Sequence, residues 1–192
     1  MPARVAALAA AAALLLGLAA SAVADDTPDV VHRCRSHDGR WLLAARDVPP
    51  TLLLFDAEHR PVKTWPVTSR NGQTVSRIAA IVDAPARRSF VVALRDLAEL
   101  WEISYDPKAE DFYDGPVHDF RMGEGVPVRG FLNPRRTYLG EPLESLRFDP
   151  VSTEVIGLAR ATVQRINLDV RRRVASEPLA DAALTAGATV CP

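Results

Sequence analysis

Short apolar runs separated by turn residues recur along most of the chain. The clearest hairpin pattern lies at 41–45 and 51–55, because the segment 47–50 between them ends in two prolines. Further strands are predicted from apolar or alternating residues at 62–67, 77–82, 89–94, 100–104, 154–159, 162–168 and 172–175. Nothing after residue 24 keeps a helical spacing over three turns, so the pattern predicts an all-β protein.

The segment 106–146 lacks this regularity. It is rich in Pro, Gly and charged residues and contains few apolar runs. A stretch of this length without periodicity is uncommon in a compact domain. The sequence therefore predicts an irregular loop here, which is either functional or poorly ordered.

A weak internal repeat groups the predicted strands. Three hydrophobic strands each run into an aspartate and a turn, at Asp56, Asp106 and Asp169. The spacing is near the blade period of β-propellers once the irregular segment is allowed for. We therefore predict about three four-stranded blades, which is fewer than the four or more that close a propeller. Such a partial propeller is either truncated or completes itself by association.

The N-terminal residues 1–24 have the composition of a signal peptide. Arg4 precedes an apolar run from residue 5 to residue 20, and the small residues of 21–24 follow as a cleavage site. The run is shorter than the roughly 20 residues that cross a hydrocarbon core. We expect export to the periplasm and a mature domain of residues 25–192.

Charge and composition exclude some partners. The formal net charge is −1 and the isoelectric point is near 6.4, so the chain lacks the basic surface that holds nucleic acid. No G-x-S-x-G or H-E-x-x-H motif is present, which leaves hydrolase and zinc-protease chemistry without support.

Two cysteines remain after the predicted cleavage, Cys34 and Cys191. In an oxidising compartment they can pair and join the two ends of the domain; the alternative is two unpaired thiols. Neither belongs to a C-x-x-C-H motif, so c-type haem attachment is excluded.

Several phrases of the chain resemble the cytochrome d1 haem-domain propeller family. They occur in family order between about residues 36 and 169, and they are moderately specific. The phrases are Pro49-Pro50-Thr51-Leu52-Leu53-Leu54-Phe55-Asp56, Ser76-Arg77-Ile78-Ala79-Ala80-Ile81, Arg88-Ser89-Phe90-Val91-Val92-Ala93-Leu94 and Leu100-Trp101-Glu102-Ile103-Ser104-Tyr105.

The resemblance implies an eight-bladed propeller that holds haem d1, or a precursor of it, without a covalent bond. His118 matches a pocket histidine of the family, so it is the candidate iron ligand and the candidate catalytic proton carrier. Arg77 begins a family strand and is the candidate partner of a macrocycle carboxylate. Arg121, Arg135 and Arg136 are further arginines of the loop, for which surface salt bridges are the expected role.

The chain also departs from the family. The blade that carries the family's iron-ligating histidine is missing, and no histidine follows His118. These departures argue against a nitrite reductase like that of denitrification, although the sequence leaves the question of enzyme activity open.

Two functions follow from the resemblance. The first is a periplasmic protein that binds a haem d1-type tetrapyrrole and resembles the haem d1 biosynthesis proteins, with c-type cytochromes, maturation proteins or further copies of itself as partners. The alternative is a non-enzymatic propeller module, or a truncated remnant, that binds a protein partner without cofactor.

Overall fold

The computed structural model describes residues 29–113, 127–149, 154–179 and 191 of the 192-residue chain. Within these ranges the chain forms strands and one short 3-10 helix, η1 (Pro85–Arg87). The described residues include no helix that is long and apolar enough to cross a membrane.

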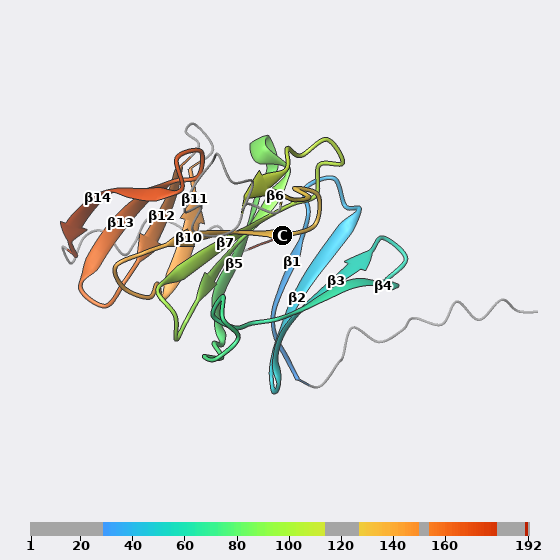
Figure 1. Ribbon diagram of the computed structural model, residues 1–192, viewed down its shortest axis with the longest axis horizontal. Helices are drawn as coiled ribbons and strands as arrows, with labels where there is room; N and C mark the ends of the chain where they lie inside the picture. Colours follow the sequence, from blue (N-terminus) through green and yellow to red (C-terminus); the bar gives the residue numbers. More distant parts are fainter. Residues whose placement is uncertain (1–28, 114–126, 150–153, 180–190, 192) are drawn as a thin grey trace, which may run out of the picture.

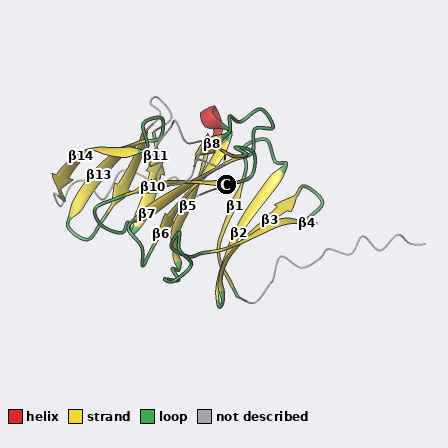
Figure 2. Ribbon diagram, in the orientation of Figure 1, coloured by secondary structure: helices red, strands yellow, loops and turns green. Residues whose placement is uncertain are grey.

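Twelve of the strands form three four-stranded antiparallel sheets, which we call blades 1, 2 and 3 (Figures 1 and 2). Blade 1 contains β1 (Val30–Arg35), β2 (Trp41–Asp47), β3 (Pro50–Asp56) and β4 (Pro61–Pro66). Blade 2 contains β5 (Ile78–Ala84), β6 (Ser89–Leu94), β7 (Glu99–Ser104) and β10 (Pro134–Tyr138). Blade 3 contains β11 (Ser145–Phe148), β12 (Glu154–Leu158), β13 (Thr162–Asn167) and β14 (Arg172–Pro178).

The three blades lie side by side, with blade 2 in the middle (Figure 1). The first strands of the blades, β1, β5 and β11, are neighbours, so they form the inner edge of the assembly. This is the arrangement of a β-propeller, and the prediction of about three four-stranded blades is confirmed. The repeated aspartates Asp56, Asp106 and Asp169 all end or follow the third strand of a blade, as the repeat predicted.

Apolar side chains fill both seams between the blades. The seam between blades 1 and 2 buries Leu43 and Leu54 against Phe90 and Trp101. The seam between blades 2 and 3 buries Val91 and Leu100 against Val155 and Ile166. Every residue of β6 is buried, because the middle blade is covered on both faces.

The prediction of an irregular segment at 106–146 is wrong for two strands. Pro134–Tyr138 is the outer strand β10 of blade 2, and Ser145–Phe148 is the inner strand β11 of blade 3. β10 pairs with β7 from across an insert, and its only fully buried side chain is the polar Thr137. Its sequence therefore shows no apolar period. The sequence analysis also missed β1, whose only buried residue is Cys34.

The rest of 106–133 is an insert between the third and fourth strands of blade 2. Its described part contains a small antiparallel pair, β8 (Phe112–Tyr113) with β9 (Pro127–Val128). The insert starts where β7 ends, at the same end of blade 2 as η1. We call this the insert end of the blades.

Candidate functional site

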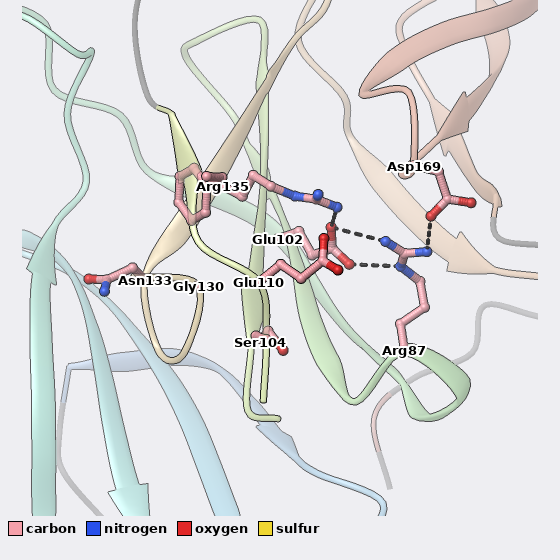
Figure 3. Close-up of a pocket in the computed structure, with 10 residues that line it drawn as sticks. Arg87, Glu102, Ser104, Glu110, Gly130, Asn133, Arg135 and Asp169 are labelled. Carbon is pink, nitrogen blue, oxygen red and sulfur yellow. Dashed lines mark hydrogen bonds and ion pairs between the residues drawn. The ribbon is translucent and has the colours of Figure 1, made fainter. Parts of the chain in front are cut away.

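A cavity of about 270 Å³ opens at the insert end, between blades 2 and 3 (Figure 3). Its walls come from η1, β7, β10, the insert and the turn after β13. The lining residues are Arg87, Glu102, Ser104, Ala109, Glu110, Phe112, Gly130, Asn133, Arg135 and Asp169.

Glu102 is the buried charge of this pocket. It lies on β7 between Trp101 and Ile103, and its carboxylate accepts hydrogen bonds from Arg87 Nε at 2.7 Å, from Ser89 Oγ at 3.0 Å and from Arg135 Nη2. Burial alone would raise the pKa of Glu102, but the hydrogen bond from Arg87 and the charges of Arg135 and Arg87 outweigh it. The pKa of Glu102 is therefore held below its usual value, and the group is an anion at neutral pH.

The same two arginines connect blade 2 to blade 3. Arg87 Nη1 lies 2.6 Å from Asp169 Oδ1, and Arg135 Nη2 donates to the carbonyl of Leu168 at 3.0 Å. Figure 3 shows Glu102 between the two guanidinium groups, with Asp169 on the far side of Arg87. Arg87 and Asp169 are 82 positions apart, so only the packing of the blades brings them together.

The insert closes the pocket on the side of blade 1. Lys63 of β4 donates to the carbonyl of Leu132 and to Oδ1 of Asn133, both at 2.7 Å. Burial lowers the pKa of Lys63. Gly130 packs so closely on the chain at 109–110 that an added Cβ would lie 2.1 Å from the Glu110 carbonyl oxygen. The insert base is thus held between blades 1 and 2.

A second buried carboxylate joins blades 1 and 2 at the insert end. Asp83, at the end of β5, accepts the Tyr105 hydroxyl at 2.9 Å and the backbone N–H of His37 at 2.8 Å. Burial raises the pKa of both Asp83 and Tyr105. The group acts in the seam, because Asp83 lies outside the lining of the pocket.

The predicted iron ligand His118 lies outside the described residues, between the ends of β8 and β9 in sequence. The described histidines are His32, His37 and His59, and none of them lines the pocket. No cluster of three or more His, Cys, Asp or Glu suited to a metal occurs among the residues that the structure describes. The role of His118 stays a prediction.

Arg77 is described, and it lies away from the pocket. Its guanidinium binds both carboxylate oxygens of Asp96, at 3.0 and 2.7 Å, and the hydrogen bond from Arg77 is the main cause that lowers the pKa of Asp96 to about 2. Arg77 precedes β5 and η1 follows it, so a strand of about 20 Å separates Arg77 from Arg87. A contact between Arg77 and a macrocycle carboxylate stays a prediction.

The sequence expectation for Arg135 and Arg136 was a surface salt bridge, and the structure corrects it. Arg135 binds the buried Glu102, while Arg136 binds the buried Glu99 at 3.0 Å and stacks over Trp101 at 4.5 Å. Arg121 lies outside the described residues.

Three pocket residues escaped the sequence analysis as site residues: Arg87, Glu102 and Asp169. One signal was available, because Glu102 is a carboxylate inside an apolar strand and such a residue needs a buried partner. The identity of that partner could not be read from the sequence.

Cys34 and Cys191 form a disulfide, one of the two alternatives left by the sequence. Cys34 lies on the inner strand β1, and both sulfurs pack against the core between blades 1 and 2. The bond therefore fixes position 191 at the inner edge of the assembly.

The described pocket does not by itself fit a whole tetrapyrrole. Its volume is below the roughly 300–1,000 Å³ of ligand pockets, and no described imidazole faces it. The guanidinium of Arg135 beside Phe112 suits a carboxylate-bearing edge of a planar ligand, not the complete ring.

Known proteins match both the sequence and the fold. The dihydro-heme d1 dehydrogenase of Pseudomonas aeruginosa is 35% identical over 147 residues, which cover 75% of this chain and 25% of that protein. The structure titled dihydro-heme d1 dehydrogenase NirN in complex with DHE matches with a TM-score of 0.63 and 31% identity, over 79% of this chain and 28% of the other. This chain thus spans about a quarter of the length of these relatives.

More distant structures share the fold alone. The hydrazine synthase of Kuenenia stuttgartiensis is 12% identical, with a TM-score of 0.53 over 85% of this chain and 40% of its own. The WD40 repeats of RRP9 are 9% identical, with a TM-score of 0.51 over 77% of this chain and 38% of their own.

A family model decides the assignment. The model for the cytochrome D1 heme domain matches residues 14–113, which is more than half of the chain. The phrases that carried the resemblance at 49–56, 76–81, 88–94 and 100–105 fall inside this match. The chain belongs to the cytochrome D1 heme domain family.

Proposed function

We propose that this protein binds a haem d1-type tetrapyrrole without a covalent bond and takes part in haem d1 biosynthesis. The observation that carries the proposal is the 35% identity to a dihydro-heme d1 dehydrogenase over three quarters of the chain. The related NirN structure was solved in complex with DHE, which supports a tetrapyrrole as the ligand.

The chain contributes two candidate ligand contacts to this function. His118 would bind the iron, since a neutral imidazole is a common metal ligand, and it would carry protons near neutral pH. Arg77 would bind a carboxylate of the macrocycle through its two parallel donors. Since Asp96 already occupies those donors, the ligand carboxylate would compete with Asp96.

Location and protein partners complete the proposal. A signal peptide at residues 1–24 would deliver the protein to the periplasm, where c-type cytochromes or maturation proteins of haem d1 would meet it. N-terminal sequencing of the protein recovered from the periplasm tests the cleavage after Ala24.

The experiment for the ligand is a titration of the oxidised mature protein with haem and with a haem d1 precursor, followed by absorption. We expect a saturable spectral change, and we expect His118→Ala to weaken binding about tenfold or more. Arg77→Gln should also weaken it. Asp96→Asn is the matched control, because it removes the same ion pair but leaves the guanidinium available to the ligand.

Two results would contradict the proposal. Folded wild-type protein that gives no spectral change with either tetrapyrrole would remove the ligand. Equal weakening by Arg77→Gln and Asp96→Asn would show that Arg77 acts only through its ion pair.

The second candidate is a module that binds a protein partner without a tetrapyrrole. The absence of a histidine from the lining of the described pocket favours it. Folded wild-type protein without tetrapyrrole binding is the result that this candidate predicts.

A further inference from the structure

One face of blade 1 is turned away from blade 2, and we call it the outer face. The strand register places the side chains of Leu42 and Phe55 next to each other on this face, and those of Ala44 and Leu53 in the next row. These four residues form the centre of the face. None of them belongs to either core cluster of the described residues.

The two middle strands of blade 1 are apolar on both faces. β2 reads Trp-Leu-Leu-Ala-Ala and β3 reads Leu-Leu-Leu-Phe, without the polar alternation of a sheet that has one face in water. β6 of blade 2 has the same character, and blade 2 is covered on both sides. The composition of blade 1 is thus that of a doubly covered blade, although its outer face has no cover among the described residues.

Blade 3 occupies the other end of the row and is built differently (Figure 1). On its outer face Ile156 lies between Arg147 and Arg165, and Arg165 forms an ion pair with Glu154 at 2.5 Å. A charged ladder of this kind suits a face in contact with water. Of the two end blades, only blade 1 presents a continuous apolar centre.

We propose that the outer face of blade 1 is a dimer interface, on which a second copy of this chain packs with the same face. An isologous contact of this kind is the commonest form of oligomer, because one self-complementary patch is sufficient. It differs from the head-to-tail association that would complete a propeller, which needs blade 3 as well. The proposal is independent of tetrapyrrole binding.

The distribution of charge defines the orientation of the two copies. Arg33 and Arg35 lie on β1 at one edge of the face, while the exposed Thr64 lies on β4 at the other edge. A two-fold axis parallel to the strands, between β2 and β3, places each β1 over the partner's β4. The arginines then face neutral side chains instead of one another.

The size of the face predicts a weak dimer. Four strands of about six residues cover roughly 20 by 19 Å, so two such faces remove on the order of 800 Å² of flat area before side-chain relief is counted. Stable interfaces bury about 1,200–2,000 Å², and smaller ones are transient. We therefore expect a dimer that dissociates in the micromolar range.

Sedimentation velocity of the mature, oxidised protein over about 1 to 200 µM tests the proposal. We expect the weight-average mass to rise from one chain to two with concentration. Leu53→Asp should weaken the dimer by about tenfold or more, because it places an unpaired charge in the interface. Ile156→Asp is the matched control on the outer face of blade 3 and should leave the dimer unchanged.

Thr64→Arg provides a second variant that is expected to fold normally, since Thr64 is exposed. It should also weaken the dimer, because it adds a cation opposite the partner's Arg33 and Arg35. Circular dichroism of each variant separates loss of association from loss of fold. A monomer at every concentration, a dimer that both blade 1 variants leave unchanged, or equal weakening by Ile156→Asp would overturn the proposal.

Discussion

Glu102 is the residue on which the contact between blades 2 and 3 depends. Its carboxylate is 6% exposed and accepts hydrogen bonds from Arg87, Arg135 and Ser89. We expect Glu102→Gln to lower the free energy of unfolding by about 3 kcal/mol, because it leaves two guanidinium groups of the seam without their shared anion. Urea denaturation measures the change.

Glu154→Gln is the matched control for this prediction. It removes the anion of the exposed pair with Arg165, so we expect a loss below about 1 kcal/mol. The cost of Glu102→Gln should also depend on pH. Because the folded pKa of Glu102 lies below 4.5, its contribution is fully present above about pH 4.5 and is lost as the pH falls through the folded pKa. Equal losses in the two variants would contradict the role given to Glu102.

The insert of blade 2 is the element that shapes the pocket, and Gly130 is its tightest point. In Gly130→Ala the new Cβ would lie 2.1 Å from the Glu110 carbonyl oxygen, and a backbone atom cannot rotate out of the way. We expect a loss of about 1–3 kcal/mol in the free energy of unfolding. We also expect faster proteolysis within 106–133, measured by mass spectrometry of the fragments.

Gly140→Ala is the control for the insert. Its Cβ would lie 3.4 Å from Arg173 Nη1, the end of a flexible side chain, so the chain should tolerate it. Unchanged proteolysis of the insert in Gly130→Ala would show that the contact with Glu110 does not hold the element in place.

The disulfide acts on the molecule as a whole, because Cys34 and Cys191 are 157 positions apart. On the chain-entropy estimate, closure of so long a loop stabilises the fold by about 5 kcal/mol. We expect reductant to shift the urea midpoint of the wild type to lower concentration. The double variant Cys34→Ser/Cys191→Ser should already have the lower midpoint and should not respond to reductant. An unchanged wild-type midpoint would contradict this prediction.

Local signals in the sequence determined the class of fold. The apolar runs at 51–55, 89–94 and 100–104 became strands of blades 1 and 2, because strand formation here follows from nearby residues and from the turns between them. The aspartates that end the third strands showed the repeat. The phrases in family order identified the cytochrome D1 heme domain family.

Tertiary structure decided the rest, since it depends on residues that are distant in sequence. β10 pairs with β7 across an insert, so the sequence of β10 alone could not identify it as a strand of blade 2. Arg87, Glu102 and Asp169 come from two blades, and only the packing of the seam makes them one network. The run Leu52–Phe55 predicts a buried strand but not what covers each face; the structure shows blade 2 on one face, while the cover of the other face rests on the proposed dimer.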